Sequence, residues 1–208
     1  MVTTAQLVAF LLAALLITVS PGPDNLMVLS IGVSKGRRQG MAFGLGCALG
    51  CLSHTVLAVV GVSALVAASP IAFTALKWAG GLYLVWLGIG ALRSKGSVSG
   101  AVQTTPDAPL SALFFKGVVA NAINPKVVLF FLSFLPQFVV PAQGSVAAQL
   151  GVLGVVFTAQ AALLFGLLGY FAGHVGGWLK RTPRAALWLD RIAGTIFIGL
   201  GLKLATAR

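Results

Sequence analysis

The chain has 208 residues, of which 58% are hydrophobic and 8% are charged, and its formal net charge is +11. Its mean hydropathy is +1.01. Soluble domains carry about 25% charged residues, so the composition excludes an ordinary soluble domain and is typical of an integral membrane protein. The positive charge does not indicate a nucleic-acid partner, because the basic residues cluster at the ends of apolar runs, where the positive-inside bias explains them.

Apolar runs longer than about 18 residues predict helices that span the lipid bilayer. The sequence contains six such segments, at about 4–33, 39–68, 71–92, 112–140, 146–172 and 186–205. The first is interrupted by the motif SPGPDN at residues 20–25, and the fourth by Asn124-Pro125. Both interruptions lie near the centre of their segments.

A polar connection from Arg93 to Pro109 divides the chain into two halves. Each half opens with a proline-broken segment, continues with a long Gly/Ala/Val-rich segment and closes on a related phrase, AGGLYL at 79–84 and AGTIFI at 193–198. Three crossings are an odd number, so the second half enters the bilayer inverted, as in many transporters. We expect one all-α transmembrane transporter domain over 1–208, with six helices in two inverted repeats, 1–92 and 111–208, joined by a cytoplasmic linker, 93–110.

The basic residues predict the orientation of the chain. The loops and flanking turns on one side hold ten of them: Lys35, Arg37, Arg38, Arg93, Lys95, Lys116, Lys180, Arg181, Arg184 and Arg191. The other side holds three: Lys77, Lys203 and Arg208. The positive-inside rule places the first group in the cytoplasm and both termini outside.

The prolines predict that the first and fourth helices are broken near the bilayer midplane. Proline lacks an amide hydrogen and ends a helix that runs through it, but it suits the first turn of a new helix after a Ser, Asn or Asp cap. Ser20-Pro21 and Asn124-Pro125 have this form, and Asp24 could cap a restart at Asn25. The expected structural breaks are Pro21, Gly22, Pro23 and Pro125. The alternative is a pair of ordinary proline kinks in packed helices.

Several motifs resemble, in this order, the lysine-exporter family of bacterial amino-acid exporters, near its homoserine/threonine-efflux branch. They are SPGPD at 20–24, the glycine-rich run 40–54, LKWAG at 76–80, YLVWLG at 83–88, FKG at 115–117, Asn121, NPK at 124–126 and FLPQF at 134–138. The resemblance covers essentially the whole chain. It implies a secondary transporter, not an enzyme, that exports homoserine, threonine or another small neutral amino acid across the bacterial inner membrane by proton antiport. The sequence contains no nucleotide-binding loop and no hydrolytic constellation, so we expect no cofactor, and it leaves open whether the protein works as a homodimer.

Two ionisable residues, Asp24 and Lys126, lie inside predicted spans, one beside each break. A charge at the centre of a span costs roughly 2.5–3.5 kcal/mol and marks a functional candidate. We expect the substrate ammonium at Asp24, and the substrate carboxylate at Lys126 and the helix start at Pro125. The full set of expected substrate- and ion-binding residues is Asp24, Asn25, Asn121, Asn124, Lys126 and His54. The alternatives are that Asp24 only caps a helix and that Lys126 reaches to the membrane interface.

His54 shares a helical face with small residues, among them Gly44, Cys47 and Cys51. Small residues mark close helix contacts in membranes, so His54 should face protein, either as a packed side chain or as a proton relay that tunes the pH dependence of transport. The two cysteines leave open a second function, a membrane thiol–electron carrier. No metal site is expected, because acidic ligands are nearly absent.

Overall fold

The computed structural model describes residues 2–62, 64, 69–94 and 108–206, and this part of the chain is helical, with no strand. The first half contains α1 (Thr4–Val19), α2 (Pro23–Lys35), α3 (Arg37–Leu57) with a π-helical extension η1 (Ala58–Val62), and α5 (Pro70–Arg93). The second half contains α6 (Leu110–Ala122), α7 (Pro125–Leu129), the turns η2 (Phe130–Phe134), η3 (Leu135–Phe138) and η4 (Pro141–Gln143), then α8 (Val146–Tyr170), α9 (Ala172–Arg181) and α10 (Pro183–Thr206). Most of the predicted linker, 95–107, lies outside the described residues.

The described helices include three to five candidate membrane spans. Three single helices are long and apolar enough: 37–61, 71–93 and 146–170. Two more spans result if each bent pair counts as one: α1 with α2, bent by 55°, and α6 with 125–138, bent by 51°. The sixth predicted segment, α10, is not among them, and this helix carries four charged residues, Arg184, Asp190, Arg191 and Lys203.

The helix ends at the two breaks follow different local rules. Asn124 caps α7 as predicted, because its Oδ1 accepts a hydrogen bond from the Lys126 amide at 3.1 Å and Pro125 occupies the first turn. The predicted cap at Ser20 is wrong. Ser20 instead ends α1, and its hydroxyl donates to the Leu16 carbonyl at 2.6 Å. The cap of α2 is the extended Gly22, and Asp24 lies inside the first turn, not at the cap.

Helix α3 packs closely against its neighbours through glycines. A Cβ on Gly46 or Gly117 would collide with the backbone of the facing helix, α6 or α3. A Cβ on Gly40 would lie 2.8 Å from the Cα of Gly32 in α2. These close approaches explain why the small-residue face of α3, and its continuation to Ala58 in η1, is buried. Gly61, at the end of this face, is exposed. His54 is buried, as predicted.

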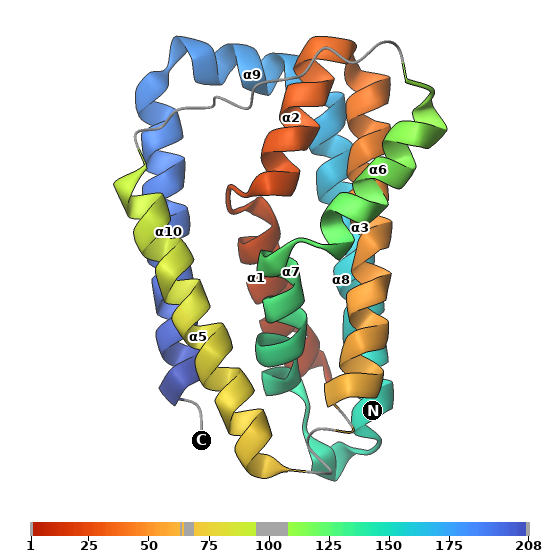
Figure 1. Cartoon of the computed structure of the whole chain (residues 1–208), viewed down its shortest axis with the longest axis vertical. Helices are drawn as coiled ribbons and strands as arrows, with labels where there is room; N and C mark the ends of the chain where they lie inside the picture. The colour runs from red at the N-terminus through yellow and green to blue at the C-terminus, as the bar shows by residue number, and fades with distance from the viewer. Residues whose placement is uncertain (1, 63, 65–68, 95–107, 207–208) are drawn as a thin grey trace.

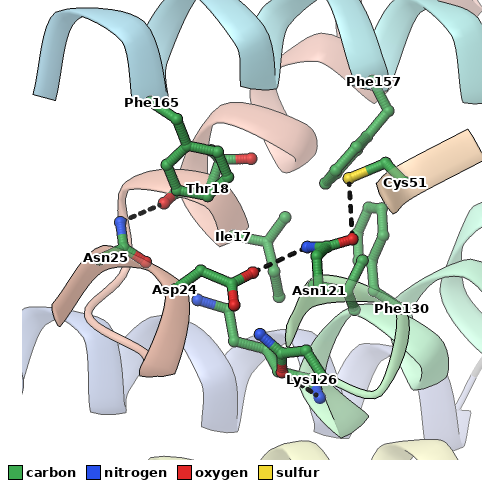
Figure 2. Close-up of a pocket in the computed structure, with 12 residues that line it drawn as sticks. Ile17, Thr18, Asp24, Asn25, Cys51, Asn121, Lys126, Phe130, Phe157 and Phe165 are labelled. Carbon is green, nitrogen blue, oxygen red and sulfur yellow. Dashed lines mark hydrogen bonds between the residues drawn. The ribbon is translucent and has the colours of Figure 1, made fainter. Parts of the chain in front are cut away.

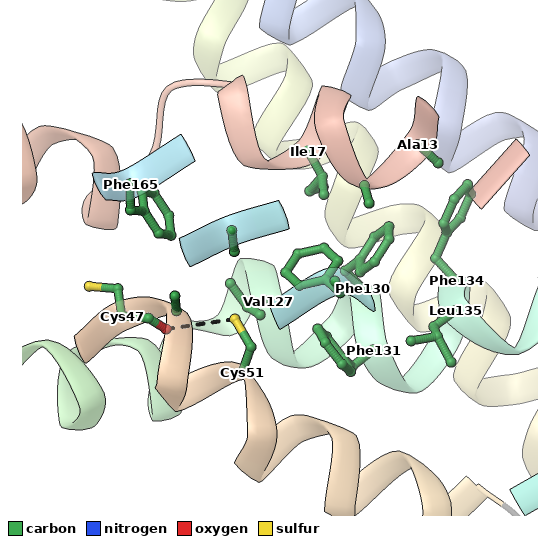
Figure 3. Packing of buried hydrophobic residues seen from close by; sticks show 14 of the residues in the cluster. Ala13, Ile17, Cys47, Cys51, Val127, Phe130, Phe131, Phe134, Leu135 and Phe165 are labelled. Carbon is green, nitrogen blue, oxygen red and sulfur yellow. Dashed lines mark hydrogen bonds between the residues drawn. The ribbon is translucent and has the colours of Figure 1, made fainter. Parts of the chain in front are cut away.

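The core of the bundle is aromatic and lies beside the second break. Phe10 of α1, Phe130 and Phe131 of η2 and Phe157 of α8 are all buried. Their rings pack at centroid distances between 4.9 and 6.5 Å, and Figure 3 shows the stack below α1. Aromatic pairs of this kind add about 0.5–1.5 kcal/mol each beyond area burial. The cluster therefore fixes η2, and with it α7, against α1.

Helices α5 and α10 form a pair beside the rest of the bundle (Figure 1). They contact each other through Gly81 with Gly201 and through Gly88 with Gly194, where an added Cβ would lie 2.6–2.9 Å from the facing carbonyl oxygen. Helix α9, which the sequence did not predict, lies across the end of the molecule where α2 ends and α3 begins. Asp190 lies inside α10.

Replacing Gly117 by valine should destabilise the fold, because the added side chain collides with the Phe43 carbonyl and the Cys47 amide. Overpacking of this kind costs about 1–3 kcal/mol or more, and we expect a lower Tm in detergent. The matched control is Gly199→Val, since nothing lies within 4 Å of a Cβ at that position. Equal melting temperatures of the two variants would contradict the close α3–α6 contact.

Candidate functional site

The two breaks lie side by side although they are about a hundred residues apart in the sequence. Lys126 Nζ, from the first turn of α7, donates a hydrogen bond to the carbonyl oxygen of Ser20 at 2.8 Å. A Cβ on Gly22 would lie 2.9 Å from the same ammonium nitrogen. Glycine at the cap of α2 therefore leaves the space that the lysine side chain occupies.

Asp24 is 3% exposed, and a side chain from the opposite half holds its carboxylate. Asn121 Nδ2, near the end of α6, donates to Asp24 Oδ2 at 2.7 Å (Figure 2). Asn121 is completely buried, and the Cys51 thiol donates to its Oδ1 at 3.5 Å. The amide group is thus held with its NH₂ toward Asp24.

His54 contacts Asn121 from behind and does not reach Asp24 directly. Its Nε2 lies 3.0 Å from the Asn121 carbonyl oxygen. A carbonyl oxygen only accepts hydrogen bonds, so Nε2 carries the hydrogen. The other ring nitrogen, Nδ1, is buried without a hydrogen-bond partner among the described residues. His54 therefore braces Asn121, which in turn holds Asp24.

Lys126 is buried, with only 6% of its surface exposed, so the alternative that it extends to the membrane interface is wrong. Besides Ser20, its ammonium faces the ring of Phe197 at 5.4 Å from the centroid, a cation–π distance. No hydrogen bond joins Lys126 to Asp24, since each has its own partner. The two charges instead line one cavity from different helices, α2 and α7.

This inner cavity has a volume of about 20 Å³. Its lining, most of which is labelled in Figure 2, consists of Ile17, Thr18, Asp24, Asn25, Cys51, Asn121, Asn124, Lys126, Val127, Phe130, Phe157 and Phe165. A volume of this size holds about one water molecule, which is too little for an amino acid. The structure thus gathers five of the six predicted binding residues around one small space, and His54 is not among its lining residues.

A second, outer cavity of about 920 Å³ lies between the α5–α10 pair and helices α2 and α7. Both breaks line it, from Pro21 to Pro23 and from Asn124 to Lys126. Asn25, Asn124 and Lys126 line both cavities, whereas Asp24 lines only the inner one. These three residues therefore separate the carboxylate from the outer cavity.

Sequence reasoning missed the side chains that α5 and α10 contribute to the outer cavity: Tyr83, Trp86, Leu87, Arg93, Asp190 and Phe197. It also missed Gln160 of α8, which donates to the Thr18 hydroxyl at 2.8 Å beside the inner cavity. An amide inside an apolar segment was an available signal for Gln160. The aromatic residues of α5 and α10 gave no such signal, because aromatic residues are common in membrane helices.

Both cysteines are free and buried on α3. The second half of the chain has no cysteine, so a dithiol that joins the two halves cannot form. Among the described residues, no group of three or more His, Cys, Asp or Glu side chains could hold a metal ion. Nothing in this arrangement favours the thiol–electron carrier.

Apolar helices, paired breaks and buried charges are features of membrane transporters. The LysE type translocator family model matches residues 15–208, and the chain therefore belongs to that family. It is a multi-pass protein of the bacterial inner membrane.

Three relatives are similar over nearly their whole length. An uncharacterized membrane protein of Vibrio cholerae is 35% identical, with 96% of both chains covered. The homoserine/homoserine lactone efflux protein of Salmonella typhi is 32% identical, also with 96% of both chains covered. The leucine efflux protein of Enterobacter sp. is 27% identical over 95% of this chain and 93% of the relative. No solved structure matches the chain.

We expect His54 to tune the pH dependence of transport without being required for it, because it acts on Asp24 only through Asn121. A His54→Gln variant keeps a side-chain donor toward the Asn121 carbonyl but cannot titrate near neutral pH. The expected result is continued transport with a flatter rate–pH profile, measured in membrane vesicles. A profile identical to that of the wild type would leave His54 as a packing residue only.

Proposed function

We propose that this protein exports small neutral amino acids or their close derivatives, such as homoserine or threonine, across the inner membrane in exchange for protons. The observation that carries the proposal is the buried pair of opposite charges, Asp24 and Lys126, at two adjacent helix breaks. A zwitterion needs such a pair of opposite polarities a few ångströms apart. The relatives named as homoserine and leucine efflux proteins support the same substrate class.

The proposed architecture has six crossings in two inverted repeats, 1–92 and 111–208, with the cytoplasmic linker 93–110 between them. Helix α10 is the sixth crossing, and its 24 residues give a length of about 36 Å at 1.5 Å per residue. The glycine pairs that join α5 to α10 support this arrangement, because the last helices of the two halves meet at matching residue types. The breaks then occupy equivalent places in the two repeats.

In the loaded state, the substrate carboxylate binds Lys126 and the start of α7, and Asn124 and Asn121 supply neutral hydrogen bonds. The ammonium binds Asp24 next to Asn25. The inner cavity holds about one water molecule, so substrate reaches Asp24 only when the partition of Asn25, Asn124 and Lys126 opens. Lys126 then exchanges the Ser20 carbonyl for the substrate carboxylate.

Asp24 couples amino-acid export to proton entry, because its carboxylate holds either a proton or the substrate ammonium, but not both. When the partition is closed, only a proton or water fits beside the carboxylate. Rocking one half against the other exposes the site to each side of the membrane in turn. The buried carboxylate would be costly to carry across as a bare charge, which suppresses return of the empty, deprotonated carrier.

Asp24→Asn should abolish proton-coupled export, because asparagine neither takes up a proton nor neutralises an ammonium. Lys126→Gln should raise the half-saturating substrate concentration by about tenfold or more, the value of one charge-assisted hydrogen bond. The assay is efflux of a labelled amino-acid panel from cells, with and without a collapsed proton gradient. Lys116→Gln is the matched control, since Lys116 is exposed on α6 and lines neither cavity. Wild-type export by both site variants at normal expression would refute this mechanism.

The proposed orientation places both termini outside the cytoplasm, as the distribution of basic residues predicts. Single cysteines at positions 2 and 207, in a chain with Cys47 and Cys51 replaced by alanine, should react with a membrane-impermeant maleimide in intact spheroplasts. Reaction only after permeabilisation would mean the opposite orientation.

A further inference from the structure

Two opposite charges line the outer cavity away from the breaks. Arg93 lies at the end of α5, and Asp190 lies in the second turn of α10. The C-terminal end of α5 and the N-terminal part of α10 lie toward the end of the molecule where α9 crosses (Figure 1). The mechanism proposed above uses neither residue.

The glycine contacts between α5 and α10 place Arg93 and Asp190 at the same level. The helices are antiparallel, with Gly81 facing Gly201 and Gly88 facing Gly194. Each step forward along α5 is therefore matched by an equal step backward along α10. Continuing this register by one helical turn brings Leu92 opposite Asp190, with Arg93 next to it. In agreement, a Cβ on Gly194 would lie 2.8 Å from Leu92 Cγ.

These two charges face the cavity without neutralising each other. Among the described residues, neither side chain forms a hydrogen bond or an ion pair. The next residue in the chain, Arg191, does not line the cavity. Its guanidinium carbon lies over the Trp188 ring, 5.8 Å from the ring centroid. Arg93 and Asp190 thus offer one free positive and one free negative group to whatever enters the cavity.

The surrounding charge explains what this pair can select. The end of the molecule that holds Arg93 is rich in Lys and Arg, so it attracts carboxylates and repels ammonium groups. Asp190 is the only acidic residue that the structure describes there, since Asp24 lies in the inner cavity. A site with Arg93 alone would collect any organic anion. A site with both residues favours a molecule with an ammonium and a carboxylate.

We propose that Arg93 and Asp190 form a second binding site for the amino-acid zwitterion, at the cytoplasmic end of the outer cavity. Arg93 binds the carboxylate, Asp190 binds the ammonium, and the apolar wall of Trp86 and Leu87 accepts the substrate side chain. The site captures substrate before it reaches the partition of Asn25, Asn124 and Lys126. This proposal rests on the proposed function, amino-acid export.

The first test measures transport of labelled homoserine and labelled leucine into inverted membrane vesicles, in which the cytoplasmic face is outside. Arg93→Gln and Asp190→Asn should each raise the half-saturating concentration by about three- to fivefold, the contribution of a solvent-accessible ion pair. The maximal rate and the proton coupling should not change. Arg191→Gln, which removes the same charge beside the site, should behave like the wild type, and Arg93→Lys should retain most of the affinity.

A second test identifies the group that each residue binds. The amide of the transported amino acid keeps the ammonium but has no carboxylate. Arg93→Gln should weaken competition by the free amino acid and leave competition by the amide unchanged, whereas Asp190→Asn should weaken both. A variant that merely misfolds would weaken both equally and lower the maximal rate.

The outcomes separate this site from the proposed function. If the wild-type protein carries amino acids and both variants keep the wild-type half-saturating concentration, the second site is refuted and the export function stands. If Arg93→Gln and Arg191→Gln have equal effects, the cavity charges act only through the general surface potential, and the site is refuted as well. If the wild type carries no amino acid, the proposed function fails and this site fails with it.

Discussion

The hydrogen bond from Lys126 to the Ser20 carbonyl connects the two broken helices. Proline at 21 and 23 interrupts the helix, so the carbonyl at the end of α1 finds no intrahelical partner. An unsatisfied backbone group in the hydrocarbon region costs several kcal/mol. The lysine ammonium satisfies this carbonyl and is itself stabilised there, since the C-terminal end of a helix is partly negative. The charged residue and the break therefore depend on each other.

Asp24 is stabilised by a different route. Its position in the first turn of α2 is favourable for a carboxylate, and the buried Asn121 amide supplies a hydrogen bond from α6. Asn121 comes this close because Gly50 of α3 has no side chain, and a Cβ there would lie 2.8 Å from the Asn121 Cβ. The glycine-lined face of α3 thus determines how near the two halves approach, and with that the depth at which the carboxylate is enclosed.

The two cavities divide the work of binding between a small space, which contains the buried charges, and a much larger one. The inner cavity excludes all but a water-sized occupant, which strengthens every electrostatic interaction in it. The outer cavity is large enough for substrates with different side chains, and the α5–α10 pair forms one of its walls. That pair contacts the bundle less than the other helices contact one another (Figure 1).

The sequence alone determined the membrane class, the family resemblance, the two breaks and the six binding candidates. These follow from local chemistry: apolar length, the missing amide hydrogen of proline, and the cost of a charge in lipid. Only the tertiary structure decided that Lys126 bonds Ser20, that Gly22 and not Ser20 caps α2, that α9 is a helix and that Asp24 is closed off from the outer cavity. The Lys126–Ser20 hydrogen bond joins residues about a hundred positions apart, and the enclosure of Asp24 depends on the space between helices, so no pattern within a single segment encodes either of them.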